Sequence, residues 1–108
     1  MNSVMSMKDL GRVIENKFAM DQELQFKIAS QTQMLVAEWA AERIGLDPDS
    51  SKKFVLEMSE WGLKSGSSGF KERILKDFAA NQIEISENAL DRLIALKTQI
   101  AAKKVTRS

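Results

Sequence analysis

The chain has 108 residues, of which 44% are hydrophobic, and a net charge of +1 from 16 basic and 15 acidic side chains. This size and apolar content predict one globular domain with a real core, and the balanced charge argues against a nucleic-acid binder that depends on a positive field. The chain has no cysteine and no histidine, so the usual zinc sites and catalytic triads lack their main residues. We therefore expect a protein that is not an enzyme, with no cofactor and no metal site.

The sequence also carries no sign of membrane insertion. No apolar run approaches the roughly 20 residues that a membrane-spanning helix needs. The start, MNSVMSMKDL, lacks the basic stretch, apolar stretch and small-residue cleavage site of a secretory signal. We expect a cytoplasmic protein with no direct membrane insertion.

Residues 1–20 have the weakest helical pattern. Leu10, Ile14 and Phe18 form a modest apolar stripe among charged residues, and Gly11 within it costs about 1 kcal/mol relative to alanine. We predict a marginally ordered helical arm. It either folds as it docks into a partner's groove, with these three side chains as anchors, or packs on the rest of its own chain, and the pattern leaves both open.

From about Asp21 to Ile44 the sequence predicts a strong helix. Residues 15–46 are apolar on more than one side, which is typical of a helix with more than one neighbour. Gly45 is the expected stop. This helix is therefore predicted to be the central helix of a bundle.

Three further helices are predicted after it. Asp47 followed by Pro48 marks the start of the second helix, which carries Phe54, Val55, Met58 and Trp61 and ends in the Gly/Ser-rich stretch 64–69, interpreted as a flexible connector. The third helix presents Phe70, Ile74 and Phe78 and ends near Asn81, and after a link at 83–85 Ser86 is the expected N-cap of the fourth. The predicted fold is all-α: a four-helix bundle at residues 21–104, with the amino-terminal arm at 1–20 and a disordered tail at 105–108.

Several patterns that suggest chemistry have simpler explanations. Glu38 and Glu42 stand four residues apart, but bundle metal sites pair carboxylates with histidine, so a solvated helix edge is favoured. Residues 66–69, with Lys71 and Arg73 nearby, resemble a phosphate cradle only loosely, and weak nucleotide binding stays open. Both tryptophans, Trp39 and Trp61, are in phase with apolar stripes, which favours core packing over stacking on nucleic-acid bases.

Five short motifs follow one another along the chain: ENKFA at 15–19, ELQFK at 23–27, WAAE at 39–42, GL at 45–46 and IEISE at 83–87. Through these motifs the sequence resembles the zeta subunit family of bacterial F-type ATP synthases. The similarity covers about residues 9–100.

The resemblance implies a regulatory inhibitor whose amino-terminal segment enters the catalytic head of ATP synthase, between the catalytic subunits and the central shaft, and blocks ATP-driven rotation. The protein would then be peripheral to the inner membrane through ATP synthase. The inhibitory segment would span about Met7 to Phe18, and the predicted partner-binding residues are Met7, Leu10, Arg12, Val13, Ile14, Glu15, Asn16, Lys17 and Phe18. The alternative is a diverged helical bundle that acts as a nucleotide or small-ligand sensor.

Overall fold

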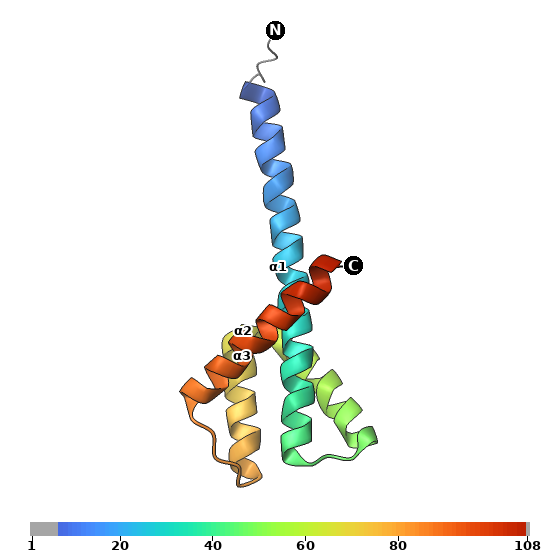
Figure 1. The fold of residues 1–108 in the computed structure, drawn as a ribbon, viewed down its shortest axis with the longest axis vertical. Helices are drawn as coiled ribbons and strands as arrows, with labels where there is room; N and C mark the ends of the chain where they lie inside the picture. The colour runs from blue at the N-terminus through green and yellow to red at the C-terminus, as the bar shows by residue number, and fades with distance from the viewer. Residues whose placement is uncertain (1–6, 108) are drawn as a thin grey trace.

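A computed structural model describes the backbone of residues 7–107 and the side chains of residues 21–107. Over this range the chain forms three helices and no strand: α1 (Met7–Ile44), α2 (Pro48–Ala80) and α3 (Glu87–Arg107) (Figure 1). The all-α prediction is confirmed. None of these helices combines the length and the apolarity needed to cross a bilayer within the part of the chain that the structure describes.

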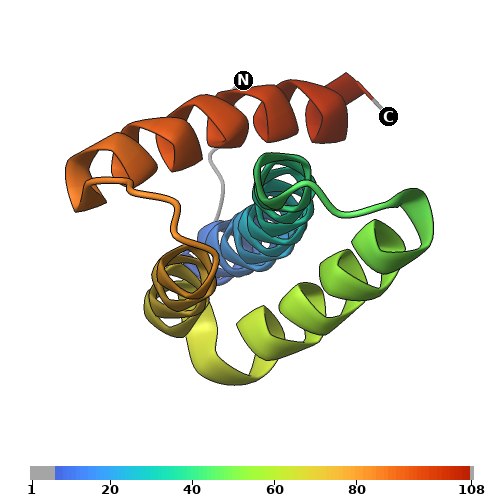
Figure 2. The same ribbon diagram turned by 90° about the horizontal axis from the view of Figure 1, so that it is seen from below.

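The central position predicted for the helix of residues 21–44 is confirmed. α1 packs against both α2 and α3, whereas the backbones of α2 and α3 approach each other at few positions, and the view along α1 in Figure 2 shows the other two helices on different sides of it. The core therefore forms along α1. Its fully buried members are Val36, Ala37, Ala40, Met58, Phe70, Ile74, Phe78 and Leu90.

The prediction of four separate helices is wrong. The Gly/Ser-rich stretch 64–69 does not form a connector between two helices but lies inside α2, whose backbone leaves the helical conformation only at Gly66 (φ 76°, ψ −178°). Since this conformation is essentially restricted to glycine, Gly66 sets the position of the kink. The kink divides α2 into a first segment (48–65) and a second segment (67–80) that run in different directions (Figure 2).

The two segments of α2 differ in how well the sequence predicted their buried faces. In the second segment Phe70, Ile74 and Phe78 are buried as expected, and the Phe78 ring lies 5.3 Å from that of Trp39. In the first segment the core prediction for Trp61 is wrong, because its side chain is 41% exposed. Its indole Nε1 donates a hydrogen bond to the Gly69 carbonyl at 3.1 Å and so bridges the kink.

The predicted helix ends are confirmed by their hydrogen bonds. At Gly45 (φ 87°) the amide donates to the Glu42 carbonyl, and the Leu46 amide donates to that of Ala41, the pair of bonds that defines a Schellman cap. Asp47 caps α2 by accepting from the Ser50 amide at 2.7 Å, and this bond lowers the pKa of the Asp47 carboxyl. Asn81 is the C-cap of α2, and the Ser86 hydroxyl caps α3 by accepting from the Ala89 amide.

Both ends of the described chain are helical. α1 continues unbroken from Met7 across the boundary between residues 20 and 21, so residues 7–20 extend the first helix. α3 continues through Arg107, so residues 105–107 of the expected disordered tail are helical. Residues 1–6 and 108 lie outside the described part of the chain.

Replacing Gly66 with alanine tests the kink. An alanine forced into the backbone conformation of Gly66 costs about 1–3 kcal/mol, so we expect Gly66→Ala to lower the free energy of unfolding by that amount in urea titrations. Ser68→Ala is the control, since Ser68 is exposed and helical, and it should change stability by no more than about 0.5 kcal/mol. Equal stabilities of the two variants would contradict a glycine-dependent kink.

The second segment of α2 is tied to α3 by Lys71, whose Nζ lies 2.8 Å from Glu87 Oε1 and 2.8 Å from Asp91 Oδ1. Bonds to Asp91 and then Glu87 raise the pKa of Lys71 above its ordinary 10.5. A raised lysine pKa stabilises the fold at pH values below 10.5, and this contribution is lost as the pH rises through the folded-state pKa.

We therefore expect Lys71→Gln to be less stable than the wild type at pH 7 in urea titrations, and the difference to shrink with added salt and to vanish above the folded-state pKa of the lysine. Lys76→Gln, on the same segment of α2, is the control for the loss of one positive charge. If the free energy of unfolding of Lys71→Gln stays below that of the wild type by the same amount at strongly alkaline pH, packing and not charge is the cause.

Candidate docking interface on the first helix

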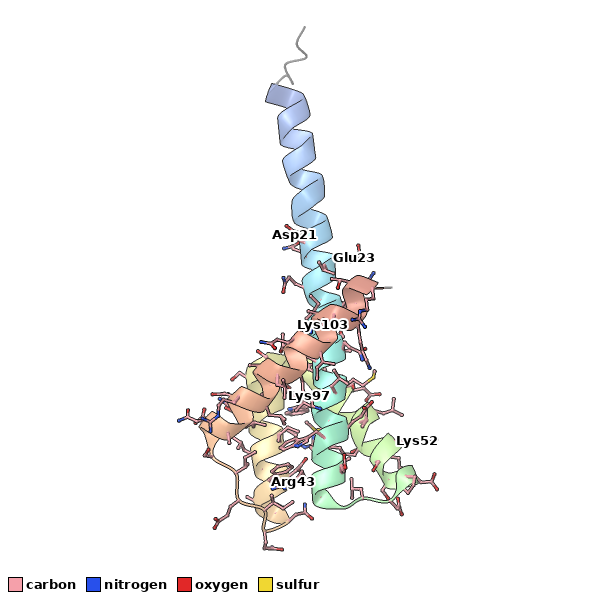
Figure 3. The ribbon with its side chains drawn as sticks, in the orientation of Figure 1. Asp21, Glu23, Arg43, Lys52, Lys97 and Lys103 are labelled. Carbon is pink, nitrogen blue, oxygen red and sulfur yellow. The ribbon has the colours of Figure 1, made fainter. Side chains whose placement is uncertain are left out.

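The amino-terminal part of α1 projects from the rest of the molecule. The structure measures 68 × 26 × 23 Å, and its long dimension follows α1 (Figure 1). A helix of 38 residues is about 57 Å long at 1.5 Å per residue, and α2 and α3 pack only along its carboxyl-terminal part (Figure 1). Figure 3 shows Asp21 at the base of the projecting part.

All of the predicted partner-binding residues lie on this projecting part of α1. The backbone there is helical from Met7 onward, whereas the side chains of residues 7–20 lie outside the described part of the structure. The structure therefore gives the register of these positions around the helix axis and not their contacts. They are Met7, Leu10, Arg12, Val13, Ile14, Glu15, Asn16, Lys17 and Phe18.

The helical register links the predicted anchors to the packed face of α1. Leu10, Ile14 and Phe18 each stand 18 residues before a position of the lower helix, and 18 residues are five turns of about 3.6 residues. The anchors therefore share one side of α1 with those positions, which lie against α2 and α3. The corresponding residues are Ile28, which is half-buried, and Thr32 and Val36, which are buried.

The first described turns of α1 carry little internal packing. Phe26 is 60% exposed, although it is a large apolar side chain. Glu23 and Lys27 form an exposed ion pair at 3.4 Å, which contributes little to stability. Sequence periodicity marks Phe26 as apolar but does not show which sides of α1 the neighbouring helices cover.

The residues considered for anion binding already have partners in the protein. Lys71 is paired with Glu87 and Asp91. The Arg73 guanidinium lies 3.4 Å from Asp77 and 5.7 Å from the centre of the Trp61 ring. A phosphate at the kink would have to replace these contacts, so the geometry does not favour the nucleotide site that the sequence left open.

The carboxylates considered for metal binding lie on an exposed edge of α1. Glu38 and Glu42 are both exposed, and Glu38 lies beside Ser51 and Lys52 of α2. Among the described residues there is no group of three or more side chains of the types that commonly hold a metal. Asp47 serves the cap of α2.

Comparison with known families identifies the chain. The model of the family described as ATPase inhibitor subunit zeta matches residues 4–104. The chain belongs to this family. No curated protein and no solved structure matches it. Membership supports an inhibitory role and identifies the zeta chain as a regulatory subunit rather than an enzyme.

Proposed function

We propose that this zeta chain inhibits ATP hydrolysis by an F-type ATP synthase, and that it does so by docking its amino-terminal arm (residues 1–20) into the catalytic head. The arm would lie between the catalytic subunits and the central shaft and block ATP-driven rotation. Residues 21–104, called the body below, would carry the arm. The family match supports the inhibitory role, and the observation that supports this mechanism is the projection of α1 beyond α2 and α3 (Figure 1).

The continuity of α1 makes the arm a suitable docking element. An isolated helix shorter than about 12–15 residues is marginal in water because its first turn is costly to form. In this chain the nucleating turn is already present, because residues 21–44 are helical and packed. The helix only has to be extended toward the amino terminus. The body thus lowers the entropic cost of presenting the arm as a helix.

The arm's composition fits a helix that binds in a groove. Leu10, Ile14 and Phe18 follow one another at intervals of four residues, the spacing of anchors on one helix face. Arg12 lies on the opposite side of the helix, whereas Lys17, seven residues after Leu10, borders the anchor face. Both would orient the helix through charge. No step of this inhibition needs a catalytic side chain, because a wedge acts by occupying space.

Deleting residues 1–18 is the first test. We expect the truncated chain to lose inhibition of a purified bacterial F-type ATPase head, measured as ATP hydrolysis, because the docking helix is gone. The core contacts of the body remain, so helicity per residue and cooperative melting of the truncated chain should be nearly unchanged. Inhibition that survives the deletion, with resonances of the body shifted by added nucleotide, would favour the ligand-sensor alternative.

The anchors are tested separately by replacing Leu10, Ile14 and Phe18 with serine in one variant. Burying each apolar side chain contributes about 1.5–3 kcal/mol, so we expect the half-inhibitory concentration to rise by about 100-fold or more. The matched control replaces three exposed leucines of the body, Leu56, Leu63 and Leu96, with serine and should leave inhibition intact. Equal losses in both variants would point to general surface hydrophobicity rather than to the arm.

A further inference from the structure

A groove of about 200 Å³ lies directly below the projecting part of α1. All three helices contribute to it: Ile28, Ala29 and Val36 from α1, Phe70 from the second segment of α2, and Ile94 from α3. An engineered cavity of about 150 Å³ is large enough to bind benzene. The groove therefore has room for one aromatic or branched aliphatic side chain.

The chemistry of the groove selects an uncharged occupant. None of the residues that line it is charged. The hydroxyl groups of Thr32 and Thr98 donate hydrogen bonds of 2.7 Å to the carbonyls of Ile28 and Ile94 on their own helices. A phosphate or carboxylate would find no cation in this lining, and burying such a charge without a partner is strongly unfavourable. An apolar side chain needs no such partner.

The register of α1 connects the groove with the arm. The α1 residues that line the groove include Ile28, Thr32 and Val36, which lie five turns below Leu10, Ile14 and Phe18 on the same side of the helix. The exposed ring of Phe26 stands one turn above Ala29, a lining residue. A partner that packs on the side of the arm carrying Leu10, Ile14 and Phe18 would therefore reach the groove if its contact surface continued along α1 toward the body.

We propose that this groove is a second docking site for the same partner: an apolar side chain of the ATP synthase head, carried next to the surface that holds the arm, inserts between the three helices. The proposal rests on the function proposed above. Asp21 interrupts the apolar side of α1 between Phe18 and Ile28, so the groove is a separate contact and not a continuation of one strip. Two separate contacts along one helix fix the angle at which the body stands against the head.

A matched pair of alanine substitutions tests the groove. Ala29 lines it, whereas Ala95 does not, and both are exposed on helices. We expect Ala29→Glu to raise the half-inhibitory concentration against the purified ATPase head by about tenfold or more, because the new carboxylate is buried without a partner at the contact. Ala95→Glu should leave it unchanged. Circular-dichroism melting of both variants checks that the fold is retained.

Photo-crosslinking gives a second readout that does not depend on the fold of a charged variant. The chain has no cysteine, so Thr98→Cys introduces a single thiol at the groove, and Ala95→Cys introduces one away from it. After labelling with a benzophenone maleimide and irradiation with the ATPase head, we expect the chain labelled at position 98 to crosslink to a subunit of the head. The chain labelled at position 95 should not.

The outcomes separate the two proposals. If deletion of residues 1–18 abolishes inhibition while Ala29→Glu inhibits as well as Ala95→Glu, or while positions 98 and 95 crosslink equally, the groove is not a docking site and the proposed function stands. If the deletion itself leaves inhibition intact, the proposed function fails, and the groove proposal fails with it.

Discussion

The packing of small side chains along α1 is the constraint on which the rest of the molecule depends. Ala37 and Ala40 are fully buried, and Ala41 is only 1% exposed, so neighbouring helices can approach the α1 backbone closely. Because α2 and α3 both pack on α1 and their backbones approach each other at few positions, neither would keep its core without these contacts. The same contacts hold residues 21–44 helical and allow α1 to extend beyond the body.

The kink in α2 follows from this arrangement. A straight helix of 33 residues would bring only one stripe of side chains against α1. By bending at Gly66, α2 places Met58 of its first segment and Phe70 and Ile74 of its second segment in the same core. The hydrogen bond from Trp61 to the Gly69 carbonyl spans the bend, so the kink has a side-chain support as well as a glycine.

Features decided by local chemistry were predictable from the sequence, and features decided by the direction of helices were not. Gly45, Asp47 and Ser86 end or start helices through bonds within a few residues, and the sequence predicts each of them. The Gly/Ser-rich stretch shows low helix propensity, but composition cannot distinguish a flexible connector from a kink inside one helix. That distinction depends on the hydrogen bond from Trp61, which sequence periodicity does not predict.

The error at Trp61 has a specific physical cause. Gly62 is buried, and a side chain added there would meet Gln33 of α1, so one close contact of the first segment of α2 with α1 lies at a residue with no side chain. A hydrophobic pattern gives no weight to such a position and places the contact on the neighbouring tryptophan instead. For the arm, periodicity defines an apolar face, and the proposed contacts of that face would depend on the surface of the partner.

The continuity of α1 also bears on how strongly a short arm can bind. A segment that folds only on binding loses conformational entropy at that moment and binds with less affinity for the same area. An arm whose helix continues from a packed core has lost part of that entropy already, so a larger share of its contact energy appears as affinity. A second contact at the groove would act in the same direction, because once the arm is docked the body is held nearby at high effective concentration. A chain that combines a packed helix, a projecting end of that helix and an apolar groove on the same side can therefore bind firmly through few anchor residues.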